Sequence, residues 1–203
     1  MAANTSESKP AFLLDDRGGE APHAPALYQP QRIVEPLAGP DAVTDGHIEQ
    51  FDELGFLSIN HLFSAEAIGA AIDGLVELIV NPPEGFTGLQ FEGAAADKLD
   101  QMTGDELQSA VRKLMRYCDW SEPLRTLRDD PTLRSLVSRL MDGRSPKCFQ
   151  EMALLKGPGG REKPWHQDHA YFSLALGEPV VGVWIALDHA TVDNACMHVI
   201  PGS

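Results

Sequence analysis

The sequence predicts an α+β fold, because its hydrophobic period changes once along the chain. Up to Leu140 the apolar residues recur at helical spacing, and after Gly143 they alternate with a period of two. Helices followed by a run of strands are typical of an antiparallel sheet whose one face is buried under helices or a second sheet. With 203 residues and 43% hydrophobic content, the chain is long enough for one domain with a substantial core.

Helices account for most of the first two-thirds. Ser64 has the character of an N-cap, and the helix that it begins carries an apolar core stripe as far as Asn81-Pro82-Pro83. Thr103 and Glu106 have capping-box spacing ahead of further apolar residues. The spacing therefore predicts helices from Thr44 to the stop signal Gly55, from Ser64 to about Val80, from Thr103 through Met115, and from Asp130-Pro131 through Leu140.

Strands are predicted where apolar and polar residues alternate. Val180 to Leu187 shows this pattern most clearly, with valine, isoleucine and leucine on one face. A glycine-rich turn follows the strand that ends near Lys156. The predicted strands are 56–59, 148–156, a segment that carries His166 and Asp168, 180–187 and 196–200.

Residues 1–40 contrast with the rest of the chain. They contain six prolines and little apolar periodicity, which favours an extended or disordered arm. The predicted organisation is thus an arm at 1–40 and one folded domain at 41–203.

Composition excludes several classes of partner. The net charge of -14 and the pI near 4.8 are unsuited to binding nucleic acid or an anionic membrane, since both require clustered lysine and arginine. The longest apolar stretch is interrupted by Asp73 and Glu77, and no signal or transit peptide is evident, which indicates a soluble protein. The three cysteines form no CxxC pair, so a reducing, cytoplasmic setting is expected.

His166 and Asp168 are the candidate metal ligands. In a strand, residues two apart project from the same face. An imidazole and a carboxylate, joined by a second histidine from elsewhere, form the facial triad that holds non-haem Fe(II). Because a bare HxD motif is more often a surface His-Asp pair, its surroundings must decide.

Three segments in order provide those surroundings: GFLSINHLFS near residue 55, HQDHAYF from His166, and VGVWIALDHATVDNACMHVIPGS up to Ser203. Together they resemble the phytanoyl-CoA dioxygenase (PhyH) family over roughly residues 45–203. The resemblance implies a double-stranded β-helix, a jelly-roll of the cupin type. It also implies a dioxygenase that uses Fe(II), 2-oxoglutarate and O2 to hydroxylate a small organic substrate.

The resemblance assigns roles to five residues. His166 and Asp168 match the iron ligands, while Trp184, Met152 and Lys98 match positions that contribute to the 2-oxoglutarate pocket. Each of the last three also has an ordinary structural reading. Trp184 could be a core aromatic, Met152 simple packing, and Lys98 a solvated surface lysine.

The third ligand has no clear candidate. His169, His189 and His198 do not match its expected place, and the resemblance puts a distal histidine and a carboxylate-binding arginine beyond Ser203. The expectation is a jelly-roll that is incomplete at the C-terminus and belongs to a longer enzyme. The alternative is a truncated or non-catalytic relative with a binding or regulatory role. Substrate identity and oligomeric state are left open.

Overall fold

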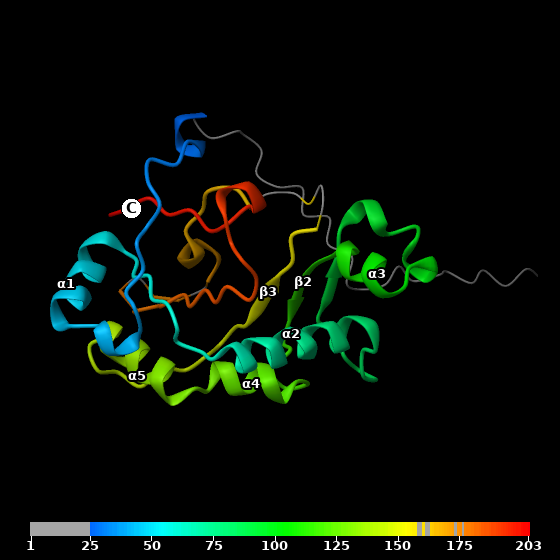
Figure 1. Cartoon of the computed structure of the whole chain (residues 1–203), viewed down its shortest axis with the longest axis horizontal. Coiled ribbons are helices and arrows are strands. Elements are labelled where there is room, and N and C mark those ends of the chain that lie inside the picture. The colour runs from blue at the N-terminus through cyan, green and yellow to red at the C-terminus, as the bar shows by residue number, and fades with distance from the viewer. Residues whose placement is uncertain (1–24, 158–159, 161–162, 173, 176) are drawn as a thin grey trace, which may run out of the picture.

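The fold is described by a computed structural model that covers residues 25–157, 160, 163–172, 174–175 and 177–203 (Figure 1). Most of the predicted arm, residues 1–24, therefore lies outside the described part. The elements are α1 (Asp45–Leu54), α2 (Ala65–Val80), β1 (Leu89–Phe91), α3 (Gly104–Ala110), β2 (Val111–Met115), α4 (Glu122–Arg128), α5 (Pro131–Leu140) and β3 (Met152–Leu154), with short 3₁₀ turns at Pro25–Tyr28, Pro40–Ala42, Gly93–Ala95, Leu99–Gln101, Asp168–Tyr171 and Val192–Asn194.

Three helices form where their capping residues predicted them. Ser64 caps α2 by accepting a hydrogen bond from the backbone N–H of Ala67 at 3.2 Å. Asp130 caps α5 by accepting one from Leu133 at 2.9 Å. Helix α1 ends at Gly55, whose φ of 80° lies in the left-handed region that favours glycine. The predictions of all three helices are confirmed. They succeed because each helix end depends on residues next to it in the sequence.

A three-stranded antiparallel sheet lies at the centre, in the order β1-β2-β3. The prediction of one helix from Thr103 through Met115 is wrong in its second half, because α3 ends at Ala110 and β2 begins at Val111. Val111 is β-branched, and its strand gains a hydrogen-bonded neighbour on either side, which an isolated helical turn would lack. Tertiary pairing thus outweighs the local helical pattern.

The core lies between the sheet and α2, which also contacts α4. In Figure 1 these two helices run side by side along one border of the sheet. Leu114 at the centre of β2 is 0% exposed and Ile79 of α2 is 1% exposed. Helix-on-sheet packing confirms the α+β class at this coarse level.

The strand predictions after Gly143 are largely wrong. The strand at 148–156 is reduced to β3, and residues 166–168, 180–187 and 196–200 form no strand. Residues 56–59 contribute an isolated bridge between Leu37 and Ile59. Alternation indicates which side chains could share a face, but a strand also needs a hydrogen-bonded partner strand. Residues 166–168, 180–187 and 196–200 have no partner strand within the described residues.

The double-stranded β-helix is consequently not seen in the described part of the chain, which shows one small sheet instead of two packed ones. That architecture remains an expectation from the family. Among the same residues, no helix is long and apolar enough to cross a membrane.

A buried thiol gives the core a dependence on pH. Cys118 is 1% exposed, and burial, with the carboxylate of Glu151 nearby, raises the pKa of its thiol to about 12. In the unfolded chain this thiol ionises near pH 8.5. The stability that the folded chain gains from keeping the thiol neutral is therefore complete below pH 8.5 and is lost as the pH rises towards 12. We expect the free energy of unfolding to fall by on the order of 1–2 kcal/mol between pH 8 and pH 10.

Urea denaturation at both pH values measures this loss, and Cys118→Ala is the control that should reduce it. The part that remains belongs to Cys148, because burial also raises the pKa of that thiol. Burial also raises the pKa of Tyr117, whose own contribution is lost at higher pH. An equal fall in the wild-type chain and in Cys118→Ala would contradict the assignment to Cys118.

Candidate metal centre

His166 and Asp168 lie together, although not on a strand. Nε2 of His166 is 3.1 Å from Oδ1 of Asp168. Asp168 begins a 3₁₀ turn that ends at Tyr171, and this turn bends the carboxylate back towards the imidazole. About a third of the His166 side chain and two-thirds of the Asp168 side chain are exposed, at 34% and 68%. The predicted proximity is observed, while its predicted cause, strand alternation, is wrong.

The protonation of the imidazole follows from its other nitrogen. Nδ1 of His166 is 2.7 Å from the carbonyl oxygen of Pro164, which can only accept a hydrogen bond. Nδ1 therefore carries the proton, and in the neutral ring Nε2 presents a lone pair. That lone pair faces a carboxylate oxygen, which is also an acceptor. Two acceptors at this distance repel each other. The contact therefore requires either a proton on Nε2 or a metal cation between the two atoms.

The spacing of these two atoms fits a shared cation. Ligand atoms about 2.1 Å from one ion and at a right angle to each other are about 3.0 Å apart. The observed 3.1 Å agrees with that value. A backbone carbonyl that holds the far nitrogen of the ring is also the usual way in which proteins orient a metal-binding histidine. Both ligand types and their support thus suit a divalent transition metal.

Aromatic contacts hold the segment that carries the pair. The Trp165 ring makes edge contacts with Tyr28 and His198, at centroid distances of 6.4 and 6.3 Å. Phe172 packs edge-on against Phe149 at 4.9 Å, just before β3. Because β3 belongs to the sheet, these contacts join the candidate metal ligands to the folded core.

The structure places the three predicted cosubstrate residues on separate elements. Met152 is half-buried at the start of β3, opposite Met115 of β2. Trp184 is 50% exposed in the irregular segment 180–187. Lys98 is exposed between the 3₁₀ turns Gly93–Ala95 and Leu99–Gln101, which precede α3 in the chain. Their cosubstrate roles stay predictions.

No third protein ligand joins the pair within the described residues. In that part of the chain, no three histidine, cysteine, aspartate or glutamate side chains are grouped so that they could hold a metal. Of the three histidines weighed for that place, His169, His189 and His198, the last contacts the Trp165 ring. The third ligand expected beyond Ser203 stays a prediction.

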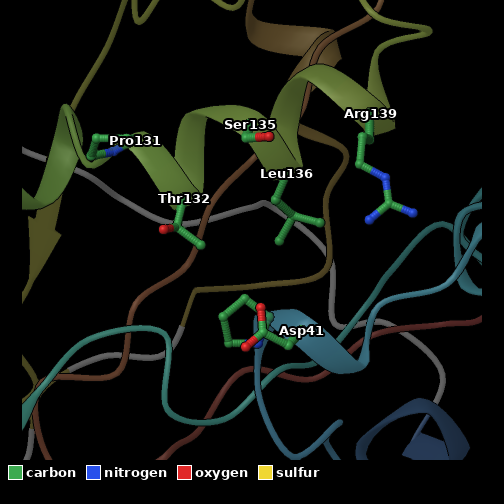
Figure 2. A pocket seen from close by; sticks show the side chains of 7 residues that line it. Asp41, Pro131, Thr132, Ser135, Leu136 and Arg139 are labelled. Carbon is green, nitrogen blue, oxygen red and sulfur yellow. The ribbon is translucent and has the colours of Figure 1, made fainter.

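A separate pocket lies between α5 and the turn Pro40–Ala42, with a volume of about 350 Å³ (Figure 2). Arg139 lines it, but its guanidinium donates to the carbonyl of Val43 at 3.1 Å and to the carboxylate of Asp45 at 3.0 Å. The arginine therefore ties α5 to α1, and the pocket contains none of the predicted site residues. Its lining residues are Pro40, Asp41, Pro131, Thr132, Ser135, Leu136 and Arg139.

Two neighbours of the pair were missed by sequence reasoning. Pro164 acts through its backbone carbonyl, which no sequence motif reveals. Tyr171 packs its ring perpendicular to the His166 ring at 5.8 Å. The sequence could have indicated this contact only if a helical turn had been predicted between Asp168 and Tyr171.

An imidazole and a carboxylate that lie 3.1 Å apart, on a chain of mixed helix and sheet, make the protein a candidate metal-binding protein. Comparison with known proteins names the family. The family model described as phytanoyl-CoA dioxygenase (PhyH) matches residues 51–203. The chain belongs to the phytanoyl-CoA dioxygenase family, whose members use Fe(II) and 2-oxoglutarate.

Curated relatives agree with this assignment. The chain is 27% identical to the peroxisomal phytanoyl-CoA dioxygenase of Mus musculus over 97% of its own length and 57% of the relative's. It is 28% identical to phytanoyl-CoA dioxygenase 1 of Oryza sativa over 83% of the chain and 66% of the relative. It is also 31% identical to the L-proline trans-4-hydroxylase of Streptomyces griseoviridis, over 56% of the chain and 44% of that enzyme.

The chain therefore spans about three-fifths to two-thirds of the length of these phytanoyl-CoA dioxygenases. No solved structure matches it closely enough to count as similar. At the level of the family, the comparisons support a dioxygenase.

Proposed function

We propose that the chain carries part of the active site of an Fe(II)- and 2-oxoglutarate-dependent dioxygenase that hydroxylates a small organic molecule. The observation that carries this proposal is the His166–Asp168 pair, in which Nε2 of the imidazole lies 3.1 Å from Oδ1 of the carboxylate. When bound, the metal supplies the activation of O2 that couples oxidation of 2-oxoglutarate to oxidation of the substrate. The proposal rests further on the family assignment.

The chain's own residues would perform three tasks. His166 and Asp168 would hold the metal through Nε2 and Oδ1, and Pro164 would fix the ring through Nδ1. Asp168 would lower the net charge of the cation by one, while the small number of ligands leaves positions for the cosubstrate. Trp184, Met152 and Lys98 remain the predicted cosubstrate contacts, and the third ligand is proposed to follow Ser203.

The partners belong to the same proposal. The substrate would be a small molecule, and the similarity to an L-proline trans-4-hydroxylase supports an amino acid as one candidate class. The cysteines Cys118, Cys148 and Cys196 are free thiols, which supports a reducing, cytoplasmic setting.

Succinate formation tests the proposal. The purified chain, and in parallel a chain extended past Ser203 to the length of its relatives, would receive Fe(II) under anaerobic conditions, then 2-oxoglutarate and O2. We expect metal-dependent succinate release by the extended chain. Release by the 203-residue chain itself would show that it completes the site with a ligand of its own.

The second candidate, a non-catalytic relative with a binding or regulatory role, is favoured by the absence of a third ligand among the described residues. Metal binding without succinate release in either chain would select it.

A further inference from the structure

The ring of Trp165 links the N-terminal part of the chain to the candidate metal centre. Trp165 immediately precedes His166, and its ring makes edge contacts with Tyr28 at a centroid distance of 6.4 Å and with His198 at 6.3 Å. Both distances lie within the range of favourable aromatic pairs. Side chains from three distant parts of the sequence thus meet next to the His166–Asp168 pair.

Within the described residues, no hydrogen bond holds this ring. Nε1 of Trp165 is buried and has no hydrogen-bond partner among them. A buried indole N–H usually finds an acceptor, which then fixes the direction of the ring. Because Trp165 lacks that bond here, the direction of its ring depends on the rings packed against it. Tyr28 is one of these two rings.

The backbone connects the Trp165 ring to the proposed metal ligand. Nδ1 of His166 donates to the carbonyl oxygen of Pro164 at 2.7 Å. That oxygen belongs to the peptide group that joins Pro164 to Trp165, and a peptide group is planar. A backbone rotation that shifts the Trp165 ring therefore also turns the Pro164 carbonyl, and with it the imidazole that donates to this carbonyl. The direction of Nε2 of His166 thus depends on the packing of Trp165.

The segment that carries Tyr28 is attached to the domain at its other end. The backbone N–H of Leu37 donates to Ser58 at 2.8 Å, and the carbonyl of Leu37 accepts from Asn60 at 2.8 Å. Residues 29–36, which lie between this attachment and Tyr28, are all exposed. Figure 1 shows this blue segment running from the turn at Tyr28 down to α1. Tyr28 therefore reaches the metal-site segment without being part of the hydrophobic core.

We propose that Tyr28 is a positioning residue of the candidate metal centre and orients His166 through Trp165. Tyr28 does not touch the metal pair itself, and its ring acts by keeping the Trp165 ring in place. Its relevance to metal binding rests on the proposed function. Tyr28 lies outside residues 51–203, which the family model matches, so the family assignment gives it no role.

Metal-free NMR tests this role independently of turnover. The full chain, labelled with ¹⁵N in its tryptophans and with ¹³C in its histidines, gives separate signals for the Trp165 indole N–H and the His166 ring. Tyr28→Leu keeps an apolar side chain but removes the aromatic ring. We expect it to shift both signals and to speed the exchange of the Trp165 indole N–H with solvent, because the buried Nε1 loses its cover. The indole signals of Trp120 and Trp184 should stay unchanged.

Cobalt(II) titration of the same chains measures the consequence for metal binding. Groups that directly support a metal ligand change its affinity about 10- to 100-fold, and Tyr28 acts one contact further away, so Tyr28→Leu should weaken cobalt binding about three- to tenfold. Tyr28→Phe keeps the ring and should retain both the NMR signals and the affinity. Ile33→Ala, at an 82% exposed position of the same segment, is the matched control and should change neither. Urea denaturation of all variants checks that the core is intact.

Unchanged Trp165 and His166 signals in Tyr28→Leu would overturn the inference. Shifted signals with unchanged cobalt affinity would overturn it as well, because the ring contact would then be packing alone. Failure of every chain to bind cobalt, the wild type included, would count against the proposed function instead. In that case the metal-free signals would still decide whether Tyr28 orients His166.

Discussion

Asp168→Ala is expected to abolish specific metal binding by the chain and to lower metal-dependent turnover by at least about 100-fold. Replacing groups that merely support a metal ligand already costs about 10- to 100-fold in affinity or activity, and Asp168 is itself a proposed ligand. Its loss leaves Nε2 of His166 as the only metal-binding atom of the observed pair. It also removes the negative charge that offsets the cation.

Cobalt(II) titration measures the binding, because its visible absorption reports ligand number and geometry, and succinate release measures turnover. Asp73→Ala is the matched control, since Asp73 is an exposed carboxylate on α2, away from the pair. Unchanged cobalt affinity in Asp168→Ala would contradict the assignment of the metal centre, whatever the turnover.

The sequence predicted structure best where the determinants are local. Caps at Ser64 and Asp130 and the left-handed Gly55 lie within a few residues of the helix ends that they define. Strand β2 was mistaken for helix because Val111, Leu114 and Met115 fit both periods. What decides is pairing with Leu89 and Met152, which lie 25 and 37 residues away from their partners in sequence.

At the candidate metal centre, too, the sequence predicted the local feature and missed what depends on the path of the backbone. The spacing of His166 and Asp168 was enough to bring the two side chains together, because residues two apart can meet on a strand or across a tight turn. The Pro164 carbonyl and the Tyr171 ring depend on the local path of the backbone, which spacing does not specify.

Leu114→Ala is expected to cost about 2–5 kcal/mol in the free energy of unfolding, the range for a leucine deleted from a packed core. Leu114 is 0% exposed and lies on the middle strand, between Leu89 and Ala153. The neighbouring strands are fixed by their hydrogen bonds to β2, so they cannot easily close the cavity. With a total stability of about 5–15 kcal/mol for a typical domain, this loss would populate the unfolded chain.

Leu154→Ala supplies the matched control for that experiment. The same truncation on β3, at a side chain that is 50% exposed, should cost less than about 1 kcal/mol because little apolar surface returns to water. Urea denaturation of both variants at one pH measures the difference. Equal losses would show that β2 is not the buried central strand.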